Sequence, residues 1–199
     1  MRARIRATLI KRMGQVLDPA CCAEIELELL ATEDRSIDPK QFGAVQCGRL
    51  TFRAERFADV LPELHELHKT HWLETEKHRH GLAMNPDYDA MADQERAGQM
   101  LQFTARDCDS LVGNLRLYIR TSMHTQTLYA VEDTLYLRPE YRAGRNALRF
   151  MQYAEACLRA IGVREIRADT KNTAPAGALL MKHMGYQPVA TQYVKFLED

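Results

Sequence analysis

The chain has 199 residues, of which 46% are hydrophobic and 27% are charged. This composition excludes a disordered chain and predicts one sizeable core, with room for an appendage to a single domain. The 27 basic side chains are balanced by 27 acidic ones, so no overall charge favours nucleic acid or an anionic membrane as a partner. No apolar run approaches the roughly 20 residues that span a bilayer. Five scattered cysteines without a CxxC pair predict reduced thiols in a cytoplasmic protein.

The first 47 residues are predicted to form a helical extension. Residues 1–17 are basic and place apolar side chains on one helical face, at Ile5, Leu9, Met13 and Val16. Residues 18–38 are acidic and favour a helix over a strand, although part of the segment alternates. Either the two oppositely charged elements face each other, or the first is a basic arm for a partner or nucleic acid. A linker is expected from Asp38 to about Gly48.

Residues 48–199 alternate between strand and helix patterns, which is typical of an α/β or α+β domain. Strands are predicted at about Leu50–Arg53, Met100–Ala105, Leu111–Thr121, Leu128–Leu137, Val163–Ala168 and Gln187–Phe196. Helices are predicted at about Phe57–His78, Asp87–Gly98, Gly144–Ile161 and Ala174–Met184. Gly162 and Gly185 stand where cap glycines are expected after two of these helices.

The junction between the fourth strand and the third helix is the most informative segment. A short turn of Arg142, Ala143, Gly144 and Arg145 separates the two elements. Small residues let backbone N–H groups point into such a turn, and the helix N-terminus adds partial positive charge. The pattern indicates an anion site suited to a pyrophosphate, although many turns of this kind hold no ligand. Neither GxGxxG nor GxxxxGK[ST] occurs, so dinucleotide and P-loop sites are not indicated.

This junction resembles the (R/Q)xxGx(G/A) motif of the GNAT N-acetyltransferases. Arg142 matches its first position and Ala147 its last, whereas Arg145 replaces the middle glycine and Gly144 lies one residue early. The order of elements from residue 48 onward and the Gly185-Tyr186 pair also resemble the family. The resemblance implies an α+β fold, an α/β/α sandwich with a mixed, mostly antiparallel sheet and flanking helices. It also implies acetyl-CoA as co-substrate, and within the family the chain is similar to phage and prophage members.

The resemblance assigns expected roles to residues of this chain. The residues expected to bind the cofactor are Leu135, Tyr136, Leu137, Arg142, Ala143, Gly144, Arg145, Asn146 and Ala147. Glu132 or Asp133 is expected to be the base, but adjacent strand residues point to opposite faces, so only one can enter the cleft. Met181 stands where many family members have a tyrosine that acts as general acid and donates a proton to the leaving thiolate. Tyr186 or Tyr193 could replace it, or the thiolate could leave without an acid.

The acceptor pocket is expected on the helices that follow the first strand, from His71, Trp72, Glu74 and Tyr88. The spacing of His68, His71 and Glu74 can also suit zinc, but a polar helix face explains it more simply, and no metal is predicted.

We therefore expect an N-acetyltransferase that transfers an acyl group to a primary amine by direct attack. The acceptor would be a small-molecule or peptide amine, without a membrane or nucleic acid as partner, and a homo-oligomer is left open. Two alternatives are a non-catalytic acyl-CoA-binding or assembly module and a phage-type nucleobase-modifying enzyme of the same fold.

Overall fold

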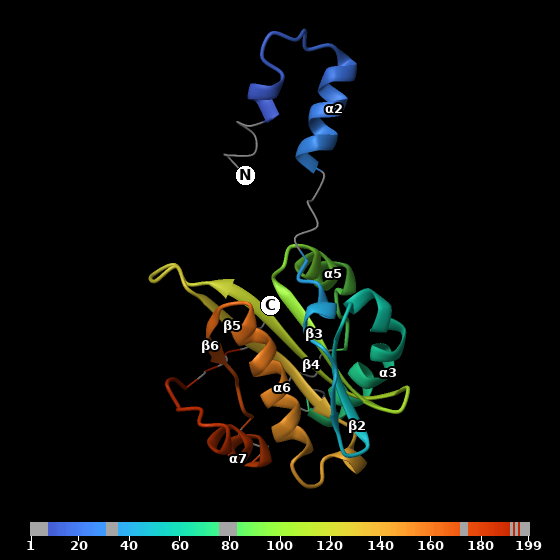
Figure 1. Cartoon of the computed structure of the whole chain (residues 1–199), viewed down its shortest axis with the longest axis vertical. Coiled ribbons are helices and arrows are strands. Elements are labelled where there is room, and N and C mark those ends of the chain that lie inside the picture. The colour runs from blue at the N-terminus through green and yellow to red at the C-terminus, as the bar shows by residue number, and fades with distance from the viewer. Residues whose placement is uncertain are drawn as a thin grey trace.

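The computed structural model describes residues 8–30, 36–75, 83–171, 175–191, 193 and 195. Its centre is a six-stranded sheet in the order β1-β2-β3-β4-β5-β6 (Figure 1). The strands are β1 (Val45–Cys47), β2 (Leu50–Glu55), β3 (Met100–Asp107), β4 (Ser110–Thr121), β5 (Leu128–Leu137) and β6 (Val163–Arg167). Neighbours are antiparallel from β1 to β5, whereas β6 runs parallel to β5. A parallel pair needs a crossover connection, which helix α6 (Asn146–Ala160) supplies.

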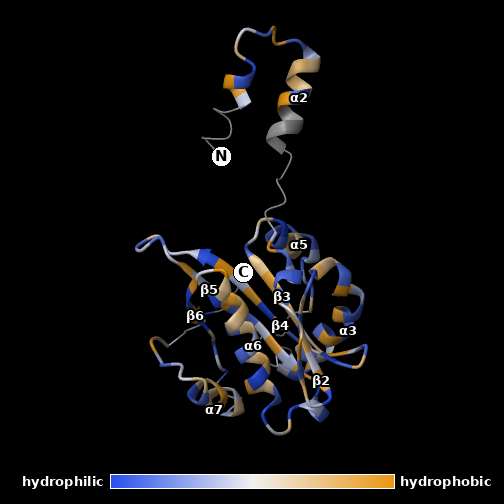
Figure 2. Ribbon diagram, viewed as in Figure 1, coloured by the Kyte–Doolittle hydropathy of each residue, from blue (hydrophilic) through white to orange (hydrophobic). Residues whose placement is uncertain are grey.

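Helices cover both faces of this sheet. The helical elements are α2 (Pro19–Leu30), η1 (Pro39–Gln41), α3 (Phe57–Thr75), α5 (Tyr88–Arg96), η2 (Pro139–Tyr141), α6 (Asn146–Ala160) and α7 (Pro175–His183). Helix α6 packs on one face with the larger core cluster, and α3 and α5 pack on the other face with a smaller one. Hydrophobic and hydrophilic residues both occur along α3, as expected for a helix with one packed face (Figure 2). The predicted α+β sandwich with a mostly antiparallel sheet is confirmed.

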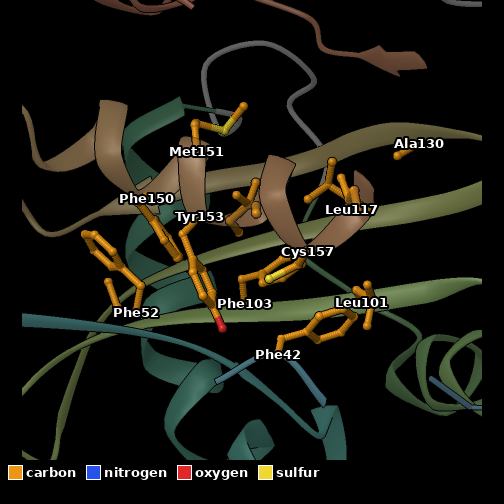
Figure 3. Close-up of a cluster of buried hydrophobic side chains, with 14 of the residues drawn as sticks. Phe42, Phe52, Leu101, Phe103, Leu117, Ala130, Phe150, Met151, Tyr153 and Cys157 are labelled. Carbon is orange, nitrogen blue, oxygen red and sulfur yellow. The ribbon is translucent and has the colours of Figure 1, made fainter. Parts of the chain in front are cut away.

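The larger core joins α6 to the sheet through aromatic side chains. The ring of Phe52 stacks on that of Phe150 at 5.1 Å, and Phe103 meets Tyr153 edge to face at 6.0 Å (Figure 3). Because both faces of the sheet are covered, β3 and β4 are buried along most of their length. These two strands also bury polar side chains, including Arg116 at 5% exposure.

Two predicted features of residues 38–199 are wrong. The expected linker before Gly48 contains η1 and strand β1, which pairs with β2 through only three residues. The predicted last strand does not appear in the described residues between 187 and 196, where Val189 and Tyr193 are 90% and 89% exposed. Alternating residues do not make a strand unless another strand pairs with them.

The N-terminal extension agrees with the prediction in its second element. Helix α2 confirms a helix over a strand, and the Asp18 carboxylate caps it by accepting the N–H of Cys21 at 2.8 Å. Arg12 pairs with Glu24 at 2.7 Å, so the opposite charges do meet. The expected helix to residue 17 is wrong beyond residue 11, where a turn contains Gly14 at φ 85°.

Ile5 lies outside the described residues, and the division of the chain at residue 48 stays a prediction. None of the helices in the described part of the chain has the length and apolar character of a bilayer-spanning segment.

Candidate active site

The turn between β5 and α6 presents unused backbone donors. Gly144 adopts φ 69°, a conformation that side chains disfavour, and α6 begins at Asn146, two residues later than predicted. Within the described part of the chain, no group accepts a hydrogen bond from the N–H of Ala143, Gly144 or Arg145, and no side chain caps α6. Asn146 instead closes the turn by donating its side-chain amide to the Tyr141 carbonyl at 3.0 Å. The turn therefore offers open N–H groups beside the positive end of a helix dipole.

Arg142 lies at this turn but is already paired. Its Nη1 and Nη2 atoms lie 2.5 and 2.7 Å from the two carboxylate oxygens of Glu74, near the end of α3. Its Nε donates to the Leu137 carbonyl at 2.7 Å, and its guanidinium lies 5.1 Å from the ring centroid of Tyr136. Hydrogen bonding to Arg142 lowers the pKa of Glu74, so the pair is fully ionised near neutral pH. The structure thus joins a predicted cofactor residue to a predicted acceptor residue.

Among the described residues, strand β5 has an edge without a strand partner that leads to this turn. Strand β6 pairs with β5 only from Leu128 to Val131, so the two strands part at residue 132. On the side of β5 that faces β4, the backbone N–H of Arg138 donates to the Val112 carbonyl at 2.9 Å. Hydrogen-bonded pairs alternate along an antiparallel ladder, so Leu135 and Leu137 direct their N–H and C=O groups away from β4.

A β-bulge marks the point of separation. Arg116 of β4 opposes Thr134, and Leu117 opposes Glu132, so Asp133 is the extra residue. The bulge reverses the alternation of β5: Thr134 faces α3, where its hydroxyl meets His71 Nδ1 at 3.0 Å. Bulges commonly re-aim side chains next to functional sites.

Glu132 and Asp133 therefore have different environments. Burial, followed by the charges of Asp133 and Asp169, raises the pKa of Glu132 to about 7. A carboxylate with this pKa can accept a proton near neutral pH. Asp133 faces the α3 side and accepts hydrogen bonds from Arg116 Nε and Nη2 at 2.9 and 2.7 Å, both on its Oδ2 atom. Glu132 is therefore the better base candidate, a distinction that the sequence left open.

Tyr186 follows α7 in a Schellman turn. Gly185 adopts φ 81°, and the backbone N–H of Tyr186 donates to the Met181 carbonyl at 3.0 Å. Burial and the neighbouring carboxyl of Glu155 raise the pKa of Tyr186. A tyrosine that holds its proton this firmly is a weak acid, so Tyr186 is a poor donor to a leaving thiolate. Tyr193 is 89% exposed.

The predicted acceptor residues lie on the face covered by α3 and α5. Burial and the nearby positive charge of Lys171 lower the pKa of His71 to about 4, so its imidazole is neutral near pH 7. Tyr88 begins α5, and Trp72 is half-buried on α3. No group of three or more His, Cys, Asp or Glu side chains could hold a metal ion in the described ranges, and His78 and His80 fall outside them.

Two residues of this face were not among the predicted site residues. Arg116 and His68 are buried, and each contacts a predicted residue: Arg116 binds Asp133, and His68 Nδ1 lies 3.2 Å from the Tyr88 hydroxyl. A signal for Arg116 existed in the sequence, since a charged residue interrupts an otherwise apolar stretch of a strand, LRLYI. The sequence marks His68 only by its metal-like spacing from His71 and Glu74.

Comparisons with solved structures identify the fold, whereas no family model and no curated protein sequence matches the chain. An aminoglycoside acetyltransferase from an uncultured soil metagenomic sample, solved with sisomicin, superposes with TM-score 0.63 at 12% identity. That match covers 75% of this chain and 97% of the other. A ribosomal-protein-alanine N-acetyltransferase from Brucella melitensis biovar Abortus 2308 superposes with TM-score 0.62 at 14% identity, covering 75% and 99%. A transcriptional regulator from Bacillus halodurans C-125 superposes with TM-score 0.59 at 14% identity, covering 74% of this chain and 99% of the other. The chain therefore has the fold of the GNAT-type acetyltransferases.

Proposed function

We propose that this protein is an acetyl-CoA-dependent N-acetyltransferase that acts on a primary amine. The observation that carries the proposal is that the open N–H groups at residues 143–145 follow the stretch of β5, from the bulge at Asp133 to Leu137, that has no strand partner on its β6 side among the described residues. Open N–H groups at a helix start suit a diphosphate, and an unpaired strand edge suits an extended amide-containing arm. The solved structures that share this fold include named acetyltransferases, which supports acyl transfer to an amine.

Cofactor binding is proposed to use backbone groups first. The N–H groups of Ala143, Gly144 and Arg145, with those of Asn146 and Ala147, would hold the diphosphate. A Cβ at Gly144 would meet nothing within 4 Å, so the space over the turn is open. The outward N–H and C=O groups of Leu135 and the outward N–H of Leu137 would pair with the pantetheine arm, along the edge that also includes Tyr136. The Leu137 carbonyl is already used, because it accepts from Arg142 Nε.

Arg142 is proposed to change partner when the cofactor binds. The Arg142 side chain is 40% exposed, and its guanidinium is held by Glu74, whose carboxylate competes with any phosphate for the same N–H donors. Binding would then separate Arg142 from Glu74 and free a carboxylate at the acceptor side.

Acetyl-CoA supplies an acyl group activated as a thioester. Glu132 is proposed to take the proton of the attacking amine, and an N–H of the open β5 edge to polarise the thioester carbonyl. The N–C bond forms as the C–S bond breaks, and the sulfur leaves as a thiolate. No side-chain acid is required, since a thiol pKa of about 8.5 makes a thiolate an adequate leaving group.

The acceptor is proposed to be a small-molecule or peptide amine, bound near His71, Trp72, Glu74 and Tyr88. The named neighbours act on an aminoglycoside and on a ribosomal-protein alanine. A cytoplasmic location, a phage or prophage origin and a homo-oligomer stay predictions from the sequence.

Two measurements test this proposal together. Calorimetry should detect acetyl-CoA binding, and thiol release should be seen with at least one member of a panel of aminoglycosides, polyamines and alanine-terminated peptides. Binding without turnover on any amine would favour a non-catalytic acyl-CoA-binding module. Absence of binding would overturn the proposal.

A further inference from the structure

Arg116 is a buried charge at the centre of the acceptor face. It is 5% exposed and lies on β4, opposite the bulge of β5. Its Nε and Nη2 donate to Asp133 Oδ2, and its Nη1 lies 3.4 Å from His68 Nε2. Buried ion pairs add little net stability compared with apolar side chains of similar volume. What Arg116 provides is the orientation of the two groups that it contacts.

The contact with Arg116 fixes the tautomer of His68. A guanidinium can only donate hydrogen bonds, so His68 Nε2 must be the unprotonated nitrogen. The proton is then on Nδ1, which lies 3.2 Å from the Tyr88 hydroxyl oxygen. The imidazole stays neutral, since burial and the charge of Arg116 lower the pKa of His68 to about 3. His68 therefore donates to Tyr88, and the hydroxyl hydrogen of Tyr88 points to another partner.

Asp133 keeps one carboxylate oxygen available. Both Arg116 donors bind Oδ2, and Oδ1 has no hydrogen-bond partner among the described residues. The Asp133 side chain is 39% exposed, so Oδ1 can reach a bound molecule. The same face thus presents one hydrogen-bond acceptor, Asp133 Oδ1, and one donor, the Tyr88 hydroxyl.

We propose that Arg116 is a positioning residue for the acceptor, holding Asp133 in the bulge and, through His68, turning the Tyr88 hydroxyl into a donor. The inference rests on the proposed function and narrows its substrate class. A matching acceptor carries, beside its reacting amine, a hydroxyl or second ammonium for Asp133 and an oxygen acceptor for Tyr88. Amino alcohols and amino sugars have these groups, whereas simple alkylamines lack them.

The test compares Arg116→Gln, Arg116→Lys and Tyr88→Phe with the wild type, using Arg120→Gln as a matched loss of charge on the same strand. Steady-state kinetics are measured with an amino alcohol, an amino sugar and an alkylamine of equal chain length. Calorimetry gives the acetyl-CoA affinity, and ¹⁵N NMR of labelled histidine gives the His68 tautomer.

We expect Arg116→Gln and Tyr88→Phe each to raise the KM for the hydroxyl-bearing amines about tenfold, as for the loss of a buried or charged hydrogen bond. The KM for the alkylamine and the Kd for acetyl-CoA should stay within about twofold, the wild type should prefer the hydroxyl-bearing amines, and Arg116→Lys should recover part of that preference. His68 should be the Nδ1–H tautomer in the wild type and lose it in Arg116→Gln.

Equal losses on all amines and on acetyl-CoA affinity would show that Arg116 acts only on folding and would overturn the inference. So would an Nε2–H tautomer in the wild type, or Tyr88→Phe kinetics identical to the wild type. A wild type that turns over no amine would overturn the proposed function instead, and the NMR result would still decide the orientation of Tyr88.

Discussion

Removing the charge of Glu74 should tighten acetyl-CoA binding, although Glu74 belongs to the same candidate site. In Glu74→Gln, the Arg142 guanidinium loses the carboxylate that now occupies two of its donors. The amide side chain keeps nearly the same volume, so the packing of α3 should not change. A diphosphate that needs Arg142 would then meet less competition.

The magnitude follows from the exposure of the pair. Arg142 and Glu74 are 40% and 39% exposed, and ion pairs of this exposure contribute about 0.5–1 kcal/mol. If the ligand no longer has to break this ion pair, its binding free energy becomes more favourable by that amount, which corresponds to a Kd about two- to fivefold lower. The free protein should lose a similar small amount of stability, so the effect on binding and the effect on unfolding have opposite signs.

Calorimetry with CoA at low and physiological salt provides the assay. Glu66→Gln is the matched control, because it removes the same charge from an exposed site on α3, eight residues away and thus about 12 Å along the helix. That distance exceeds the Debye length of about 8 Å at physiological salt. A Kd that rises in Glu74→Gln, or that changes equally in both variants, would refute the exchange of partners at Arg142.

Three other variants test separate parts of the site and fold. The kcat/KM of the wild type should rise with pH around a pKa of about 7, and Glu132→Gln should abolish that rise. Because a raised carboxyl pKa destabilises the folded protein once the carboxyl is ionised, the variant should be more stable relative to the wild type at pH 8 than at pH 5. A wild-type pH profile without that transition would exclude Glu132 as base. Arg142→Glu should weaken CoA binding more than Arg53→Glu, and equal effects in calorimetry would argue against the assignment of the turn. Gly113→Ala should lower the free energy of unfolding in urea by about 1–3 kcal/mol, because its Cβ would lie 2.8 Å from the Tyr136 carbonyl oxygen; an unchanged transition midpoint would contradict this packing argument.

Long periodic segments and cap residues were predictable from the sequence. The pattern that ends at Gly162 gave α6 within two residues at its start, and Asp87 was correctly placed at the start of α5, where it accepts the N–H of Ala90 at 2.9 Å. Strand β1 was missed because three residues carry too little pattern. The last strand was predicted from alternation alone, which does not show whether an edge is available to pair with it.

Only part of the candidate site could be predicted from the sequence. The turn at Gly144 was recognisable because its chemistry lies in consecutive residues. The pairing of Arg142 with Glu74, by contrast, joins positions 68 residues apart, and that of Arg116 with Asp133 depends on a bulge that reverses the faces of β5. The sequence placed both carboxylates in the strand but left open which of them faces which side.

The sequence by itself therefore determined the order of the long helices and strands, and it predicted a turn before α6 that is suited to an anion. Only the tertiary structure decided that burial raises the pKa of Glu132 to about 7, that Arg142 is held by Glu74 and that Arg116 contacts both Asp133 and His68. The physical reason is one of range. Helix periods, caps and turns depend on neighbours along the chain, whereas burial and ion pairing depend on segments that meet only after folding.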